Sequence, residues 1–294
     1  MPKWSVMMPL GVLAGVIIAL GLAFVIELMD TSIKSPADIS RRVDLPLLGM
    51  VPHLDDLEEE IEEPALAFKT DPDSLIGEAF RQIRSCLFFS GPADQRRSLL
   101  ITSPLPEDGR TTLALNLAGV MAQGGLRVLV VDANFRQPSI HTLFPESRQG
   151  GLSGALVGQS GWEELVQEVE PNLHVIAAGT MPPNPAELLG SEQMGTMIGE
   201  MVEKYDQVLI DSPPCMVVTD ASVLSSLVDG VVLVVRAGAN TYGIVQRARD
   251  MFVHVGAHMT GIVLNGMRVM AGGYLRKNYD TFYEYRTQEQ LPSE

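Results

Sequence analysis

The chain opens on a long uncharged stretch and then changes to shorter apolar runs separated by polar segments. Residues 6–26 are uncharged and mostly apolar, which is about the 20 residues that a helix needs to cross a bilayer. Lys34, Arg41 and Arg42 follow this stretch and only Lys3 precedes it, a bias that favours a cytoplasmic C-terminal side. A cleaved signal peptide is the alternative, but the stretch is too long and has no small-residue cleavage site. The pattern therefore predicts a single-pass membrane anchor over residues 1–34.

The segment after the predicted anchor is short and polar. Residues 35–67 contain a brief apolar stretch at 45–52 and an acidic run at 55–63. Because its like charges repel one another, such a run is typical of a solvated linker. We therefore expect a juxtamembrane segment and an acidic linker, with the folded domain starting near residue 68.

From there the hydrophobic positions follow two periods. Leu75, Ala79, Ile83 and Leu87 recur at every fourth residue after a helix-start signal at 71–74, which predicts one buried helical stripe. From residue 98, β-branched runs alternate with helical segments. This favours the α/β class, with a mainly parallel sheet covered by helices on both faces. The expected strands are 98–102, 127–132, 173–177, 207–211, 230–236 and 259–265, and the expected helices are 111–123, 185–203, 219–227 and 242–255.

Composition excludes several classes of function. The net charge is −15, whereas a protein that binds the phosphate backbone usually shows a basic face, so we expect no nucleic-acid partner. Cys86 and Cys215 are the only cysteines, and no paired Cys/His spacing suggests zinc. The cysteine usage favours a reducing compartment for most of the chain.

Residues 98–112 form an apolar run that leads through a turn into a helix. The usual phosphate-binding loop is G-x-x-x-x-G-K-[ST], whose amides cradle phosphates, whose lysine reaches the β/γ-phosphates and whose hydroxyl ligates Mg²⁺. Gly109, Thr111 and Thr112 match this pattern, but Pro104 stands at the first glycine and Arg110 at the lysine. Taken alone, the segment fits an ordinary turn as well as a nucleotide site.

Two aspartates change that balance. Asp132 and Asp211 each end an expected strand, and ligands of open parallel sheets sit beyond the carboxyl ends of the strands. Asp211 alone could be a turn or helix cap. Together with the Thr111 hydroxyl at a helix N-terminus, the two carboxylates predict a site for Mg²⁺ and a nucleotide.

At this point several segments, in their order and spacing, resemble the cytoplasmic domain of bacterial tyrosine kinases, the BY-kinases of capsule and exopolysaccharide export. The segments are 102–112, 131–138, 151–153, 179–188 and 211–214. The resemblance implies a P-loop NTPase-like domain over 68–268 and a flexible, tyrosine-rich tail over 269–294. It also implies ATP and Mg²⁺ as cofactors, a location at the bacterial inner membrane, and a polysaccharide co-polymerase or export partner. The anchor resembles the second transmembrane helix of the co-polymerase module, whose periplasmic part is expected on another chain or in a longer form of this one.

The resemblance also implies roles for individual residues. Asp132 would accept the tyrosine proton or bind metal, and Arg110 would act beside it in catalysis. Thr111, Asp132 and Asp211 would hold Mg²⁺. The expected nucleotide contacts are Pro106, Glu107, Asp108, Gly109, Arg110, Thr111, Thr112, Arg136 and Asn265, with Asn265 at the base end and Arg136 at phosphate or in packing of its motif.

Two further sets of residues carry implied roles outside the nucleotide loop. Glu78, Arg81 and Arg84 match the family's Glu-x2-Arg-x2-Arg motif and would assemble a homo-oligomeric ring; without the family, they would be read as an exposed ion-pair set. The segment after the last expected strand is polar and has too few aliphatic residues to form a core of its own, so its tyrosines are expected to be exposed rather than packed on a surface. The implied phosphoacceptors are Tyr274, Tyr279, Tyr283 and Tyr285.

Two departures from the family pattern bear on catalysis. Arg110 keeps a positive charge, but a planar guanidinium differs in length and shape from a compact ammonium. Asn134 stands at the family's second acidic position and removes one negative charge from the metal site. Because phosphoryl transfer depends on positioning and charge neutralisation, we expect weakened kinase activity.

Three other functions are compatible with parts of the pattern. One is a catalytically inactive nucleotide-binding scaffold or chain-length regulator. A second is a positioning or partition ATPase of the related deviant-Walker group, but those proteins place an extra lysine early in the loop, and none occurs between Ser103 and Gly109. A third is an iron–sulfur carrier ATPase, against which the absence of a CxxC pair argues.

Overall fold

A computed structural model describes residues 4–56, 61, 63–70, 72, 74–92, 96–145 and 150–268. The chain divides into two compact units, Met1–Ser32 and Ile33–Glu294. Helix α1 (Trp4–Met29) makes up most of the first unit and is long and apolar enough to cross a membrane. It covers residues 6–26, the uncharged stretch from which the membrane helix is predicted.

The second unit is built on an eight-stranded sheet of order β1-β8-β7-β2-β6-β3-β5-β4. Neighbouring strands run parallel except for β4 against β5. The strands β2, β3 and β6 are buried at every residue, as expected for a parallel sheet covered on both faces. The strands are β1 (Leu47–Pro52), β2 (Ser98–Thr102), β3 (Val128–Asp132), β4 (Gln167–Glu170), β5 (Leu173–Ile176), β6 (Gln207–Asp211), β7 (Gly230–Arg236) and β8 (Met259–Met267).

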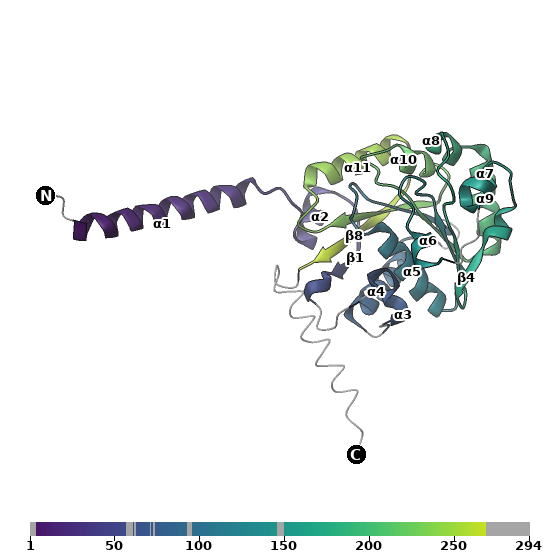
Figure 1. The fold of residues 1–294 in the computed structure, drawn as a ribbon, viewed down its shortest axis with the longest axis horizontal. Helices are drawn as coiled ribbons and strands as arrows, with labels where there is room; N and C mark the ends of the chain where they lie inside the picture. Colours follow the sequence, from purple (N-terminus) through teal and green to yellow (C-terminus); the bar gives the residue numbers. More distant parts are fainter. Residues whose placement is uncertain are drawn as a thin grey trace, which may run out of the picture. The chain divides into compact units, whose positions relative to one another are not determined.

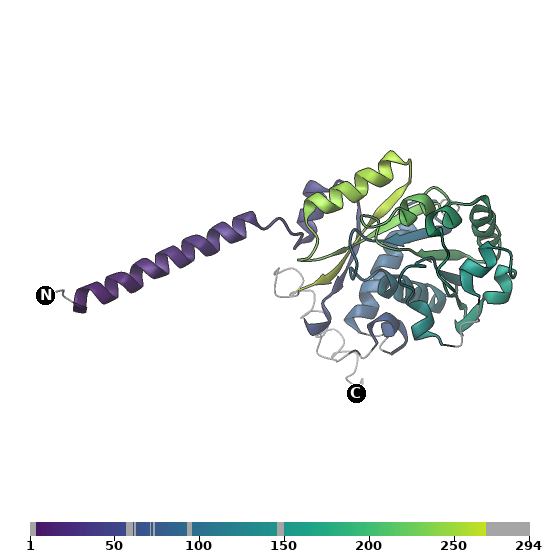
Figure 2. The ribbon, with the colours of Figure 1, turned by 45° about the horizontal axis from the view of Figure 1, so that its top comes forward.

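Helices form a layer on each face of this sheet (Figures 1 and 2). Side chains alternate along the strands, so that Leu99 joins one hydrophobic core and Leu100 joins the other. The first core contains α3 (Ala67–Thr70), α4 (Leu75–Phe89), α5 (Arg110–Gln123) and Ile140 of α6 (Ile140–Leu143). The second contains α2 (Pro36–Arg42), α7 (Gly151–Leu156), α8 (Pro185–Leu189), α9 (Glu192–Lys204), α10 (Asp220–Leu224) and α11 (Tyr242–His254).

The structure corrects the expected start of the folded domain. Strand β1 pairs with β8 at one edge of the sheet, and Ile33, Ile39 and Val43 lie fully buried in the second core. Residues 33–56 therefore belong to the same compact unit as the sheet, not to a linker that precedes it. The three-residue helix η1 (Leu54–Asp56) begins two residues after the end of β1, and η2 (Pro64–Leu66) leads into α3.

Two other expectations change in detail. The helix predicted over 185–203 is two helices, because the chain breaks at Gly190 and restarts where the Ser191 hydroxyl accepts a hydrogen bond from the Met194 amide. The helix predicted over 219–227 is shorter and ends at Leu224. The other strands and helices predicted from residue 98 onward are confirmed to within two residues at either end.

Candidate functional site

The loop between β2 and α5 is held in an unusual backbone conformation. Glu107 and Gly109 both have positive φ, of 61° and 96°. A Cβ at position 109 would collide with the side-chain amide of Asn265, so both the backbone angle and the space available favour glycine there. The loop ends at the N-terminus of the 14-residue helix α5, where free amides and the helix dipole favour a phosphate.

Arg110 does not extend away from this loop. Its Nη1 donates to the Ser103 hydroxyl at 2.7 Å and to the Leu105 carbonyl at 2.9 Å. Its Nε is buried and has no hydrogen-bond partner among the described residues. One nitrogen of the guanidinium therefore links Ser103 and Leu105 within the loop itself.

The three expected metal-binding residues do converge. Asp132 and Asp211 are register partners at the carboxyl ends of β3 and β6. The Thr111 hydroxyl donates to Oδ2 of Asp211 at 2.5 Å and lies 2.9 Å from the Ser139 hydroxyl. Oδ1 of Asp211 is buried and has no partner in the described part of the chain.

Burial dominates the electrostatics of this pair. It raises the pKa of Asp211 to about 7, with the charge of Asp132 as the second cause. Burial also raises the pKa of Asp132, although the backbone amides of Asn134, Ser139 and Ile140 donate to its carboxylate and act in the opposite direction. A cation between the two carboxylates would offset both effects.

The donor set fits Mg²⁺. This ion commonly takes one or two protein carboxylates and completes its octahedron with water and substrate phosphate. Here two carboxylates and the Thr111 hydroxyl meet at a helix N-terminus, and the unpartnered Asp211 oxygen provides a free ligand atom. Among the described residues there is no group of three or more His, Cys, Asp or Glu side chains that could hold a metal. Water and nucleotide phosphate would supply the other ligands of Mg²⁺ at such a site.

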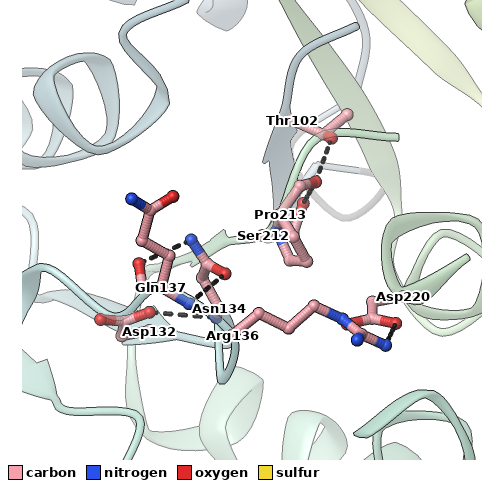
Figure 3. A network of polar contacts seen from close by, with 8 residues as sticks. All are labelled: Thr102, Asp132, Asn134, Arg136, Gln137, Ser212, Pro213 and Asp220. Carbon is pink, nitrogen blue, oxygen red and sulfur yellow. Dashed lines mark hydrogen bonds and ion pairs between the residues drawn. The ribbon is translucent and has the colours of Figure 1, made fainter. Parts of the chain in front are cut away.

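The Asn134 side chain is bonded to Gln137, three residues later in the chain. Its Nδ2 donates to the Gln137 carbonyl at 2.8 Å, and its Oδ1 accepts from the Gln137 amide at 3.2 Å (Figure 3). Both ends of the side chain are thus used within its own turn. The amide stabilises the loop after β3 rather than supplying an oxygen to the metal site.

Arg136 is also occupied within the protein. Its guanidinium forms a two-bond ion pair with Asp220, at 2.9 and 3.1 Å, and extends away from Asp132 (Figure 3). The Asp220 side chain is fully buried, and the hydrogen bond to it raises the pKa of Arg136. Of the two roles expected for Arg136, the contacts fit packing of its motif, since this pair ties the loop after β3 to α10.

A pocket of about 280 Å³ opens beside the loop between β2 and α5, residues 103–109, which we call the phosphate loop. Its polar lining includes Arg236 at the end of β7 and Asn265 in β8, and Thr112 borders it from α5. Apolar side chains close the other side: Val51 from β1 and Phe80 from α4. The residues expected at the base end and at the phosphate end of a nucleotide therefore border one continuous hollow.

The remaining predicted residues are divided. Pro106 and Glu107 are exposed at the tip of the loop, whereas Asp108 is buried and bonded within the protein. Glu78 pairs with Arg81 at 2.7 Å, and Arg84 donates to the Val120 carbonyl of α5 at 2.6 Å. The four predicted phosphoacceptors, Tyr274, Tyr279, Tyr283 and Tyr285, lie outside the described residues.

Sequence reasoning missed three residues that contact the site. Ser139 bonds Thr111, while Arg236 and Asn240 contact the phosphate loop from the end of β7. Ser139 lies seven residues after Asp132 and could have been found as a hydroxyl following a strand-end carboxylate. Nothing in the spacing of Arg236 and Asn240 links them to a loop some 130 residues earlier.

Comparison with known proteins agrees with this geometry. A ParA family model described as "NUBPL iron-transfer P-loop NTPase" matches residues 96–292. The putative tyrosine-protein kinase CapB of Staphylococcus aureus is 36% identical over 215 residues, 73% of this chain and 92% of that protein. The tyrosine-protein kinase ptk of Acinetobacter johnsonii is 31% identical over 281 residues, 93% of this chain and 38% of that protein.

A solved structure gives the same answer for the fold. The kinase domain of the Escherichia coli tyrosine kinase ETK superposes with a TM-score of 0.72 at 30% identity, covering 78% of this chain and 94% of that domain. The iron-transfer description has no counterpart in the cysteines, since Cys86 and Cys215 form no CxxC pair. The chain belongs to the bacterial tyrosine kinase family, within the ParA-like P-loop NTPases.

Proposed function

We propose that this chain binds ATP with Mg²⁺ and transfers the γ-phosphoryl group to tyrosines of its own C-terminal tail. The observation that carries the proposal is the meeting of Thr111, Asp132 and Asp211 at the N-terminus of α5, with one Asp211 oxygen left without a partner among the described residues. The loop amides would take the phosphates, and the adjoining pocket with Asn265 would take the base.

The transfer itself needs one proton acceptor. The hydroxyl oxygen of a tail tyrosine forms a bond to the γ-phosphorus, the bond from that phosphorus to the β–γ bridging oxygen breaks, and ADP leaves. Asp132 is suited to accept the tyrosine proton, because three backbone amides fix its carboxylate and burial raises its pKa. Bound Mg²⁺ would supply neutralisation of phosphate charge.

We infer that the activity is weak. Nη1 of Arg110 is bonded to Ser103 and Leu105, so a phosphate would have to bind the remaining N–H groups of the guanidinium. The Asn134 side chain contributes no charge to the metal site, and both its amide nitrogen and its amide oxygen bond to Gln137. Since each 1.36 kcal/mol of barrier is about tenfold in rate, small losses of position and charge reduce catalysis strongly.

The bond geometry of Arg110 favours a second candidate, a nucleotide-binding scaffold that does not phosphorylate. Such a chain would keep the fold and bind nucleotide through the loop amides, Thr111 and Asp211. Arg110 would stay bonded to Ser103 and Leu105 within the loop. Both candidates share the same place in the cell. We propose that α1 anchors the chain in the bacterial inner membrane with the sheet domain in the cytoplasm, where it regulates exopolysaccharide or capsule polymerisation and export.

We propose two kinds of partner. Glu78, Arg81 and Arg84 would contact a second copy and build a ring, and a polysaccharide co-polymerase or export protein would join it at the membrane. Exposure supports the first of these, because the Glu78 and Arg81 side chains keep 37% and 31% of their surface accessible.

One experiment separates the two candidates. The full chain in detergent is incubated with ATP and Mg²⁺, and phosphotyrosine is mapped by mass spectrometry. We expect slow phosphorylation of Tyr274, Tyr279, Tyr283 or Tyr285 and a faster reaction in Arg110→Lys, with Asp132→Asn as the inactive control. If wild type and Arg110→Lys both bind nucleotide but neither contains phosphotyrosine, the result would support the scaffold function and contradict the kinase. A failure to bind nucleotide would contradict both.

A further inference from the structure

Residues at the end of β7 and in the segment that follows it hydrogen-bond to the phosphate loop. Nδ2 of Asn240 donates to Oδ1 of Asp108 at 3.1 Å, and Oδ1 of Asn240 accepts from the Arg236 amide at 2.7 Å. Asn240 is 0% exposed and Asp108 is 1% exposed. A buried amide with a donor bond on one side and an acceptor bond on the other has a single allowed orientation.

Asp108 forms further hydrogen bonds, both within the loop and to β8. Its second carboxylate oxygen accepts from the Leu105 amide at 2.9 Å, and its backbone carbonyl accepts from Nδ2 of Asn265 at 2.8 Å. The carbonyl that precedes it in the chain, that of Glu107, accepts from Arg236. The loop therefore keeps its shape through side chains that lie more than a hundred residues away in sequence.

The same segment is bonded to the start of the compact unit. The Ile33 amide donates to the Asn240 carbonyl at 2.9 Å, and the Gly238 amide donates to the Ile33 carbonyl at 2.8 Å. The Ile33 side chain is 0% exposed and belongs to the second core. Ile33 is the first residue of that unit after Ser32, the last residue of the unit that contains α1.

We propose that Asn240 is a positioning residue of the nucleotide site. It holds the phosphate loop in its binding conformation through the hydrogen bond to Asp108, and this conformation depends in turn on the backbone hydrogen bonds of Ile33. This inference rests on the proposed nucleotide binding. Asn240 does not contact the phosphates; it acts through Asp108. Displacing the chain at Ile33 would shift the Asn240 backbone, and the Asp108 contact would shift with it.

The first test measures the dissociation constant of a fluorescent ADP with Mg²⁺, together with the melting temperature, on the full chain in detergent. Asn240→Ala leaves a buried carboxylate oxygen without its donor, and we expect roughly tenfold weaker binding. Gln207→Ala is the matched control. Gln207 is also a buried amide, and its Nε2 donates to the Arg96 and Arg97 carbonyls at the opposite end of β6 from Asp211. This control should lower the melting temperature and leave the dissociation constant unchanged.

The second test exchanges the two partners. Asn240→Asp alone places two buried carboxylates together, and we expect it to bind nucleotide more weakly than Asn240→Ala. The double variant Asp108→Asn with Asn240→Asp restores every bond. Its side-chain amide at position 108 can accept from Leu105 and donate to the carboxylate at position 240, and that carboxylate can also accept from the Arg236 amide. We expect the double variant to return to within about threefold of the wild-type dissociation constant, a rescue that a general loss of stability does not produce.

The third test addresses Ile33. Ile33→Ala and Ile39→Ala each remove a fully buried side chain from the same core, so both should lower the melting temperature. Only Ile33→Ala should weaken nucleotide binding, and it should add little in the Asn240→Ala background because both act through one contact.

Three outcomes would contradict parts of this account. If wild type binds nucleotide and Asn240→Ala binds it equally well, or if the exchange of the two partners does not restore binding, Asn240 is not a positioning residue. Equal effects of the two isoleucine variants would overturn the link to Ile33. Absence of wild-type binding would instead contradict the proposed function.

Discussion

At the scale of single residues, Arg110 shows what a motif match leaves open. The sequence shows that a guanidinium replaces the usual ammonium at the lysine position, but it does not indicate which atoms the guanidinium contacts. In the folded loop the guanidinium bonds Ser103 and Leu105. Both bonds come from one nitrogen, Nη1, which the arginine side chain places between two oxygens of its own loop.

Other site residues could be predicted only as members of a set. Asp132 and Asp211 were expected together because parallel strands end at one edge of the sheet, and their register pairing confirms it. The partner of Arg136 was not predictable, since Asp220 reaches it from a helix 84 residues later. A contact of that kind depends on how the layers pack, and local pattern does not encode it.

The raised pKa of Asp211 predicts a pH-dependent stability. The carboxyl titrates near 4 when unfolded and at about 7 when folded, so between these values the folded chain binds more protons than the unfolded chain. The free energy of unfolding should therefore fall as pH rises from about 4 to about 7 and then level off. The loss should be on the order of 2–4 kcal/mol.

Urea unfolding of the metal-free full chain in detergent checks this. Asp211→Asn should be more stable than wild type at pH 8 and should show a shallower fall over this range. Asp206→Asn is the control, because hydrogen bonds from Arg127 lower the pKa of Asp206 at the other end of β6. The contribution of Asp206 is lost only as pH falls through its lowered pKa. The same slope in wild type and Asp211→Asn would contradict the burial argument.

At the scale of elements, the strands of the central sheet could be predicted and its edges could not. β2, β6 and β7 lie at the expected bounds because each has a continuous apolar run at its centre that is buried on both faces. β1 ends in Pro52 and lies next to acidic residues that suggest a linker. β4 reads Gln-Glu-Val-Glu, and its single apolar residue gives no strand signal. Edge strands bury less surface, so their apolar pattern is weaker.

The turn that joins β2 to α5 predicts a specific effect of Gly109→Ala. A methyl group there meets both an unfavourable φ of 96° and the Asn265 amide. We expect a stability loss of about 1–3 kcal/mol and at least tenfold weaker nucleotide binding, since the loop must move away from Asn265. Thermal unfolding and a fluorescent ADP titration measure the two effects.

Gly125→Ala provides the matched control. Gly125 has a similar φ of 90°, but a Cβ there has nothing within 4 Å. It should therefore show the backbone cost without the change in nucleotide affinity. Equal affinities in the two variants would mean that the close approach of Asn265 does not shape the site.

At the scale of the whole molecule, the predicted class of fold and the family are confirmed, but the start of the folded unit was misplaced. The segment after α1 supplies an edge strand, a buried helix face and the Ile33 contact to the segment that follows β7. The sequence of this short segment gave no sign of this, because its burial depends on elements that pack against it in space: β8 pairs with β1, and α4 covers β1.

Assembly is the second property at this scale. Mass photometry of the full chain in detergent should show a ring-sized species that shrinks in the variant Glu78→Ala with Arg81→Ala, because the proposed contact between copies loses both charges. Glu163→Ala with Lys204→Ala removes another exposed ion pair, on the other core's side of the sheet, and should leave the mass unchanged. An unchanged mass in the first variant would contradict the ring role of these residues.

The central claim is that Thr111, Asp132 and Asp211 form a site for Mg²⁺ and a nucleotide. Isothermal titration calorimetry of the full chain with ADP, in the presence of Mg²⁺ and then of EDTA, tests it most directly. We predict that Mg²⁺ tightens ADP binding at least tenfold in wild type and has almost no effect in Asp211→Asn, which still binds ADP through the loop amides. Absence of ADP binding by wild type, or the same Mg²⁺ dependence in both proteins, would contradict the account.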